Sequence, residues 1–358
     1  MNKDILSLLQ NHTRSIYQLD VKSFEVKTIP ARELLAVTRF DLFAKIFYIK
    51  YRKSNPALAQ QVYVEHIKAF NPDLKEPGRT DKCGVDKFLT VFDKLIDDFS
   101  TVDFDDAVSI VPVDENNIIL DGAHRVAALA YYDKKVTIAK FNDVVSKGLF
   151  DYNYFINRGL SIETADLIAF EATNWCKHLY AACLWPKLSK SADRELVKDI
   201  IKRDNQLLYE KSTLVSLDHL TQFVAKIYAS QDWVGTEENH FSGARDKAMN
   251  CYSLSKRLDV IFFQSSLPLE EILKMKENVR GHFSFGKHVI HITDNDVETQ
   301  FLSSLILDKN QRNLWLKDSG WVSLNKWNEK IKEWLIVFRY NCLIPLKTFV
   351  YRLIHSCK

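Results

Sequence analysis

Residues 118–129 read Ile-Ile-Leu-Asp-Gly-Ala-His-Arg-Val-Ala-Ala-Leu. The pattern predicts a short strand that ends at Asp121-Gly122 and a helix that begins directly after it. Gly122 permits a close approach to the backbone and an unusual φ. The free N–H groups at the start of the helix, together with the positive end of its dipole, form an anion site. The stretch therefore predicts a turn that binds phosphate.

Two basic residues fall in the first turn of this helix, where positive charge is unfavourable to the helix itself. A bound anion would compensate. Arg125 would then grip two phosphate oxygens, and His124 would donate to a third or move a proton. The alternative is a polar turn in which Asp121 caps the helix and Arg125 makes a surface ion pair. The spacing leaves both interpretations open.

The surrounding residues predict a mixed α/β domain over residues 1–150. Apolar residues at helical spacing predict helices over residues 32–53, 57–70 and 85–99. A β-branched run at 107–113, a polar turn and residues 118–120 predict a pair of strands, and 136–141 a further strand.

This turn resembles the signature of the ParB/sulfiredoxin superfamily, and the resemblance covers residues 109–141. It implies a ParB/sulfiredoxin-like domain that binds nucleotide phosphates at Gly122, Ala123, His124 and Arg125. Ala123 stands where sulfiredoxins need a cysteine, so the resemblance does not extend to sulfur chemistry. No recognition-helix pattern follows residue 141, so a partition-type DNA-binding function is not favoured.

The Asp-Gly-x-His-Arg form is most similar to that of the free-serine kinases of this superfamily. That similarity implies a nucleotide cofactor (ATP, ADP or CTP) with Mg²⁺, and catalytic roles for Asp121 and His124, with Asp121 near the metal. Phosphoryl transfer also needs a base to orient the acceptor hydroxyl.

The best upstream source of such a base is the helix that contains Asp41 and Lys45, which are four residues apart and so share one helix face. Asp41 is the candidate base, and Lys45 and Arg39 are candidates for contacting the cofactor. The alternative is a solvated ion pair. Glu65-His66 on the next helix is a second candidate, and the sequence does not choose between them.

The second block, residues 151–316, alternates strands and helices, which predicts a second α/β domain. Strands are expected at 178–185, 207–215, 260–264 and 289–292, and residues 243–247 are expected in a loop. The boundary near residue 150 has no linker to mark it.

Cationic, imidazole and carboxylate side chains gather in this block. The candidates for a second site are Arg245, Lys247, Lys276, Arg280, Lys287, His288, His291, Asp294 and Glu298. This mixture suits a nucleotide or phospho-sugar site with Mg²⁺. The alternative is a solvated basic face with a histidine satisfied within its strand. The spacing of His282, His288 and His291 fits no usual zinc pattern.

Residues 286–294 with Glu298-Thr299, and residues 39–42, also resemble uncharacterised proteins of bacterial surface-polysaccharide gene clusters. This second resemblance covers much of residues 30–316. It implies a pathway rather than a reaction, and it assigns no catalytic residues.

Residues 317–358 form a third segment, with eight Lys and Arg against three Asp and Glu, interleaved with aromatic residues. We expect a helical tail that lies on an acidic membrane surface or docks on the protein's own core or on a partner. The chain has 46% apolar residues, a net charge of +3, six cysteines without metal-site spacing and no secretory segment. These features predict a cytoplasmic protein, peripheral at the inner face of the membrane if the tail binds lipid.

Together these patterns predict a nucleotide-dependent phosphotransferase that acts on a small hydroxyl acceptor or a saccharide. The alternatives are a non-catalytic nucleotide-gated binding module and a ParB-type nucleic-acid-binding protein. The small net charge of +3 does not favour a nucleic-acid partner.

Overall fold

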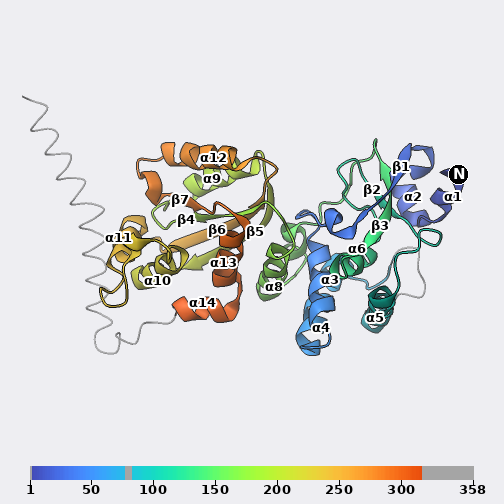
Figure 1. Ribbon diagram of the computed structural model, residues 1–358, viewed down its shortest axis with the longest axis horizontal. Helices are drawn as coiled ribbons and strands as arrows, with labels where there is room; N and C mark the ends of the chain where they lie inside the picture. The colour runs from blue at the N-terminus through green and yellow to red at the C-terminus, as the bar shows by residue number, and fades with distance from the viewer. Residues whose placement is uncertain (1, 77–82, 317–358) are drawn as a thin grey trace, which may run out of the picture. The chain divides into compact units, whose positions relative to one another are not determined.

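Two separate sheets organise the chain, which was analysed as a computed structural model that describes residues 2–76 and 83–316 (Figure 1). The first unit is Met1–Cys176 and the second begins at Lys177. Both combine helices with a sheet, which confirms the α/β class. The expected boundary near residue 150 differs from this division, because α7 (Tyr152–Ile156) and α8 (Ile162–Thr173) pack on helices of the first unit. The expected tail lies outside the described residues.

The sheet of the first unit has three strands in the order β1-β3-β2. β1 (Phe24–Pro30) is antiparallel to β3 (Lys135–Phe141), and β2 (Val111–Val113) is parallel to β3. The sequence did not indicate β1. The strand pair expected around residues 107–120 is confirmed only in part, since the ladder covers β2 and a bridge between Val113 and Ile119.

Helix α6 (Ala123–Tyr131) is the crossover between the parallel strands β2 and β3. Parallel neighbours need such a crossover, and the apolar run Val126–Ala130 of α6 is fully buried. α6 packs against α3 (Phe40–Tyr51), which in turn packs against α4 (Pro56–Phe70) and α8. The remaining helices of this unit are α1 (Asn2–Ser7), α2 (Asn11–Tyr17), α5 (Val85–Thr101) and the 3₁₀ turns η1 (Leu19–Val21) and η2 (Ala31–Leu34).

The second unit is built on a four-stranded antiparallel sheet in the order β5-β6-β4-β7. Its strands are β4 (Leu179–Leu184), β5 (Gln206–Leu214), β6 (Arg257–Gln264) and β7 (Ile290–Ile292). All four lie where the sequence predicts strands. β7 is an edge strand, and its position shapes the site described below.

Helices cover both faces of this sheet (Figure 1). α9 (Ser191–Lys202) and α12 (Leu269–Gly281) pack on one face through an apolar cluster that includes Val197, Ile272 and Ile290. The helices on the other side are α10 (Leu217–Ile227), α11 (Ser242–Cys251), α13 (Asp296–Leu307) and α14 (Lys309–Leu316), and the 3₁₀ turns are η3 (Asp232–Val234) and η4 (Gly286–His288).

The prediction of a loop at residues 243–247 is wrong, because these residues belong to α11. The buried residues of α11 are Ala244, Ala248 and Cys251, whose spacing of four and three is that of a helix face. The small side chains at these positions concealed the helical period.

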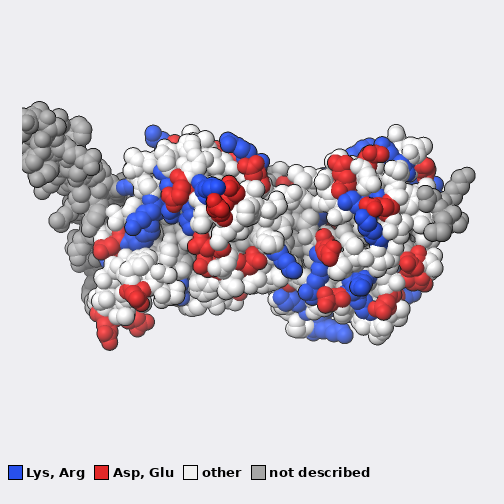
Figure 2. All heavy atoms as spheres, turned by 45° about the horizontal axis from the view of Figure 1, so that its top comes forward, with Lys and Arg blue, Asp and Glu red and all other residues white. Residues whose placement is uncertain are grey.

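Charged side chains of both signs are interspersed on the face that Figure 2 shows, over each unit. That face has no broad single-sign surface of the kind that binds nucleic acid backbones. Among the described residues, no helix combines the length and apolar character that crossing a membrane requires.

Candidate functional site

The Asp-Gly-Ala-His-Arg turn forms as the sequence predicts. Gly122 has φ of 90° and is the N-cap residue of α6. The Nη2 atom of Arg125 lies 3.5 Å from the Asp121 carboxylate, and Nη1 donates to the Ser109 hydroxyl and to the Ile110 carbonyl. A Cβ atom on Gly122 would lie 2.8 Å from Arg125 Nη2. The guanidinium therefore covers the turn, and an anion would have to displace it from Asp121.

His124 lies on the same helical turn but faces an aromatic wall. Its Nε2 atom is 2.9 Å from the Tyr63 hydroxyl, and its ring meets Phe92 edge-on at a centroid distance of 4.6 Å. Ala123 is the first residue of α6, as expected, and is partly buried. The turn thus holds the predicted residues, with Arg125 and His124 both engaged by neighbours from their own unit.

Arg39, Asp41 and Lys45 form a buried ion network instead of the surface site that the sequence predicts. Their exposed fractions are 4%, 0% and 3%. The Asp41 carboxylate accepts two hydrogen bonds from Arg39, at 2.8 and 2.9 Å, and one from Lys45 at 2.9 Å. Arg39 also donates to the Ile119 carbonyl, 2.5 Å away, which links the network to the strand before the turn.

This burial corrects both interpretations of Asp41 as an exposed group. Burial alone would raise the pKa of Asp41, but the charges of Arg39 and Lys45 outweigh it and hold the pKa far below its ordinary value. In the second candidate, Glu65-His66, the histidine is 1% exposed, and burial followed by the charge of Lys45 lowers its pKa. Glu65 is partly buried and accepts hydrogen bonds from the Ser161 and Thr164 hydroxyls. Asp41 and His66 do not reach solvent and belong to a structural network beneath the turn.

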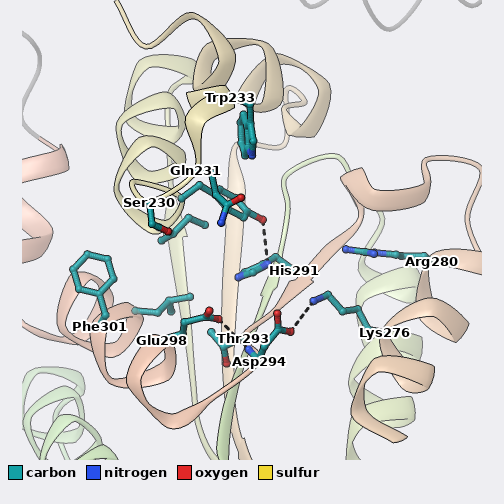
Figure 3. Close-up of a pocket in the computed structure, with 13 residues that line it drawn as sticks. Ser230, Gln231, Trp233, Lys276, Arg280, His291, Thr293, Asp294, Glu298 and Phe301 are labelled. Carbon is teal, nitrogen blue, oxygen red and sulfur yellow. Dashed lines mark hydrogen bonds and ion pairs between the residues drawn. The ribbon is translucent and has the colours of Figure 1, made fainter. Parts of the chain in front are cut away.

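In the second unit, a pocket of about 320 Å³ brings five of the nine second-site candidates together (Figure 3). These are Lys276, Arg280, His291, Asp294 and Glu298. The volume is at the small end of the range of roughly 300–1,000 Å³ that ligand pockets occupy. Titratable groups that converge on one concave surface are the usual mark of a functional site.

The two cations reach the pocket around the sheet edge. Lys276 Nζ donates to the Ile292 carbonyl at 2.9 Å, and Arg280 Nη2 donates to the Ile290 carbonyl at 3.4 Å. These carbonyls belong to the outer side of β7, which pairs with no other strand in the part of the chain that the structure describes. Lys276 and Arg280 therefore satisfy an open strand edge, which also fixes their positive charges in the pocket wall. The buried Nε of Arg280 has no hydrogen-bond partner among the described residues.

His291, the middle residue of β7, lies deep in this pocket. Its Nδ1 atom is 3.1 Å from the Tyr228 hydroxyl. Burial, followed by the positive charges of Lys276, Lys247 and Arg280, lowers the pKa of His291 to about 3. The imidazole is therefore neutral near pH 7, and one of its ring nitrogens can accept a proton.

The two carboxylates of the pocket already take part in polar contacts. Asp294 Oδ1 is 3.2 Å from Lys276 Nζ, and Glu298 accepts from the Asp294 amide at 3.0 Å. Residues 2–76 and 83–316 contain no group of three side chains that could hold a metal ion. Asp121, which the sequence placed near a metal, has the Arg125 guanidinium as its neighbour. These residues do not form a Mg²⁺ site by themselves.

The other four candidates lie outside the pocket lining. Lys247 Nζ donates to the Lys287 carbonyl at 2.9 Å, and His288 Nδ1 is 3.7 Å from Cys251 Sγ. Arg245 forms an exposed pair with Asp218 at 3.1 Å. Burial and the charge of Lys247 lower the pKa of His288 to about 4, so its imidazole is neutral near pH 7 and the positive charge beside the pocket comes from lysine side chains such as Lys247.

Sequence reasoning missed the aromatic part of the pocket. Trp233 and Phe301 line it and are 45% and 47% exposed, and Tyr228 and Gln231 line it as well. The segment Tyr-Ala-Ser-Gln-Asp-Trp at residues 228–233 leaves α10 with two aromatic residues among small and polar ones. Aromatic residues in a polar loop favour ligand binding, and the sequence alone shows this pattern.

Comparison of the chain with family models, with curated proteins and with solved structures finds no match. The chemistry of the pocket is therefore inferred from its own geometry.

Proposed function

We propose that this protein is a nucleotide-dependent phosphotransferase whose reacting phosphate binds in the pocket of the second unit. The acceptor is a small hydroxyl compound or a saccharide, and the phosphate donor is ATP, ADP or CTP with Mg²⁺. The proposal moves the phosphate site from the Asp121–Arg125 turn, where the sequence suggested it, to β7 and α12.

One observation carries this proposal: Lys276 and Arg280 project from α12 into the same small pocket as a neutral histidine. Catalysis of phosphoryl transfer consists mainly of positioning and of charge stabilisation by fixed cations. The Arg280 guanidinium pairs with the exposed Glu277 at 2.6 Å, and a phosphate that displaces this carboxylate would gain a planar fork of donors. Lys276 adds a point charge.

The pocket rim suits the rest of the substrate. Trp233 presents an exposed ring, as flat apolar ligands require, and Gln231 and Ser230 add polar groups beside it (Figure 3). A sugar ring or a nucleobase can stack on such a side chain while its hydroxyl or amino groups find hydrogen bonds.

A second function, a non-catalytic nucleotide-gated module, is favoured by one feature of the first unit. Arg125 covers Gly122 and is paired with Asp121 and Ser109. A phosphate that competes for this guanidinium would open the turn. In that case the protein would bind nucleotide without consuming it.

Calorimetric titration of the full chain with ATP, ADP and CTP, each with Mg²⁺, tests the proposal. We expect Arg280→Gln to lower the affinity for the nucleotide about 10- to 100-fold, because a charged hydrogen bond of roughly 1.5–3 kcal/mol is lost. Arg125→Gln and the exposed Arg245→Gln are the matched controls, and we expect neither to change the affinity more than twofold.

Two outcomes would overturn the proposal. One is that none of the three nucleotides binds. The other is that Arg125→Gln abolishes binding while Arg280→Gln leaves it intact, which would return the phosphate site to the first unit. Binding without transfer of phosphate to any acceptor or to water would favour the gated module.

A further inference from the structure

The surroundings of His291 single it out among the described histidines. The carbonyl groups on either side of it along β7, those of Ile290 and Ile292, accept hydrogen bonds from Arg280 and Lys276. Two positive charges therefore bracket one imidazole along a strand of three residues. In Figure 3, His291 lies between Lys276 and Arg280 on one side and Glu298 and Phe301 on the other.

Every element packed against His291 contributes a charged or titratable group. α12 supplies the two cations, and Lys247 of α11 adds a third positive charge. Cys183 lies opposite His291 in the β4–β7 ladder, and its pKa is raised by burial, so it stays a neutral thiol. Tyr228, at the end of α10, is hydrogen-bonded to Nδ1, and burial raises its pKa as well.

Among the described residues, negative charge near His291 lies on α12, where the exposed Glu277 pairs with Arg280 at 2.6 Å, and at the pocket mouth. Asp294 follows β7 and pairs with Lys276, and Glu298 of α13 is bonded to the Asp294 amide. Both side chains are exposed to solvent, so their field at the imidazole ring is screened. The field at His291 is therefore set by the three cations.

We infer that His291 is the proton acceptor of this pocket and that it becomes basic only when a phosphate group binds beside Lys276 and Arg280. This inference rests on the proposed function. A bound dianion would cancel the positive field at the ring, because opposite charges a few ångströms apart favour the charged form of each other. Binding of the reacting phosphate would thus make His291 basic enough to accept a proton.

The proton step balances within the pocket. The acceptor hydroxyl gives its proton to Nε2 of His291 while its oxygen bonds to the terminal phosphorus of a nucleoside triphosphate. The bond from that phosphorus to the bridging oxygen breaks, and its electron pair leaves with the nucleoside diphosphate. The step requires the tautomer in which Nδ1–H donates to the Tyr228 oxygen and the lone pair lies on Nε2.

Histidine NMR on the full chain tests this coupling without knowledge of the acceptor. The ring carbons are labelled, His291 is assigned with His291→Gln, and its titration is followed from pH 3 to 8. Sulfate is the probe, because this tetrahedral dianion keeps its charge over the range, unlike inorganic phosphate. The reference sample holds sodium chloride at equal ionic strength. We expect sulfate to raise the pKa of His291 by about 1 to 3 units.

Arg280→Gln separates the coupling from a general salt effect. In this variant the pKa of His291 should start higher, since one cation is gone, and sulfate should change it less. Arg245→Gln removes an exposed cation that pairs with Asp218, and its titration should match that of the unmodified chain. Tyr228→Phe should change the tautomer signature of the ring carbons.

A second readout is the rate at which phosphate is transferred from the nucleotide to any acceptor or to water. We expect His291→Gln to lower kcat about 100-fold or more and to leave KM for the nucleotide nearly unchanged. A histidine that is only structural would not produce this split.

The outcomes distinguish the two proposals. If sulfate and nucleotide perturb the pocket resonances but the pKa of His291 stays the same, the inference is wrong and the proposed function stands. If neither perturbs the pocket, both are wrong. A titration of His291 near 6.5 without sulfate would also contradict the inference.

Discussion

Two clusters in this molecule have nearly the same composition and opposite surroundings. Arg39, Asp41, Lys45 and His66 in the first unit are each 4% exposed or less. Lys276, Arg280, His291 and Asp294 in the second unit line a pocket. Each cluster has an arginine, a lysine, a histidine and an aspartate. The first is sealed, with both of its cations paired to one buried carboxylate, and the second opens to solvent.

The difference shows that composition and spacing do not separate a structural ion network from a binding site. In the first cluster Arg39 and Lys45 converge on one carboxylate, and all three side chains are buried beyond the reach of a ligand. In the second, Lys276 and Arg280 donate to the carbonyls of a strand edge and pair with the exposed carboxylates of Asp294 and Glu277, which an anion can displace. Whether the cations and their partners are buried or exposed decides whether a site can bind an anion.

Removing the aspartate from each cluster gives the largest expected contrast. Asp41→Ala leaves Arg39 and Lys45 buried without a counter-charge, and we expect a loss of about 3–5 kcal/mol of unfolding free energy. Asp294→Ala removes a side chain that is 50% exposed, and we expect a loss below about 1 kcal/mol. Urea unfolding followed by hydrogen exchange, which resolves the two units by peptide, measures both. Equal losses would mean that the clusters do not differ in burial as described.

Acid stability gives the next contrast. The folded pKa of His291 is about 3, below the ordinary value of 6.5. The unfolded chain therefore binds a proton that the folded chain does not, so stability is full above pH 6.5 and falls as the pH drops toward 3. The slope expected from one such histidine is about 1.4 kcal/mol per pH unit.

His291→Gln should reduce this slope in the second unit, where His288 also has a lowered pKa, and the first unit should keep the slope that comes from the more deeply buried His66. The check is the free energy of unfolding of each unit at several pH values between 4 and 7. An unchanged slope in the second unit would show that His291 is not the group that titrates.

The smallest effect concerns the turn that the sequence singles out. Gly122→Ala places a Cβ atom at a φ of 90° and 2.8 Å from Arg125 Nη2. We expect a loss of about 1–2 kcal/mol, because the left-handed conformation is strained for alanine and the guanidinium must move. Nucleotide affinity should stay within twofold of its original value. A large drop in affinity at unchanged stability would instead support the turn as the phosphate site.

Much of the fold could be predicted from the sequence where the periodicity was strong. The helices α4 and α5 and the strands of the second sheet lie where apolar spacing places them. β1 was missed because its alternation is weak: Glu25, Lys27 and Thr28 separate its apolar residues. Such a strand is defined by its pairing with β3, which local sequence does not record.

The candidate site was predicted in its parts. Lys276, Arg280, His291, Asp294 and Glu298 were grouped from sequence, and they line one pocket. Asp41 and Lys45 showed the same i,i+4 pattern that a surface pair would show. Their burial depends on helices α4, α6 and α8 packing around α3, a long-range property that spacing does not reveal.

Hydrogen exchange of backbone amides with and without nucleotide tests the central claim most directly. The claim is that the phosphate-binding cations are those of α12 at the edge of β7. With ATP and Mg²⁺, we predict slower exchange in peptides that cover residues 269–301 and no change in residues 118–131. Protection confined to residues 118–131 would contradict the account and return the nucleotide to the Gly122 turn.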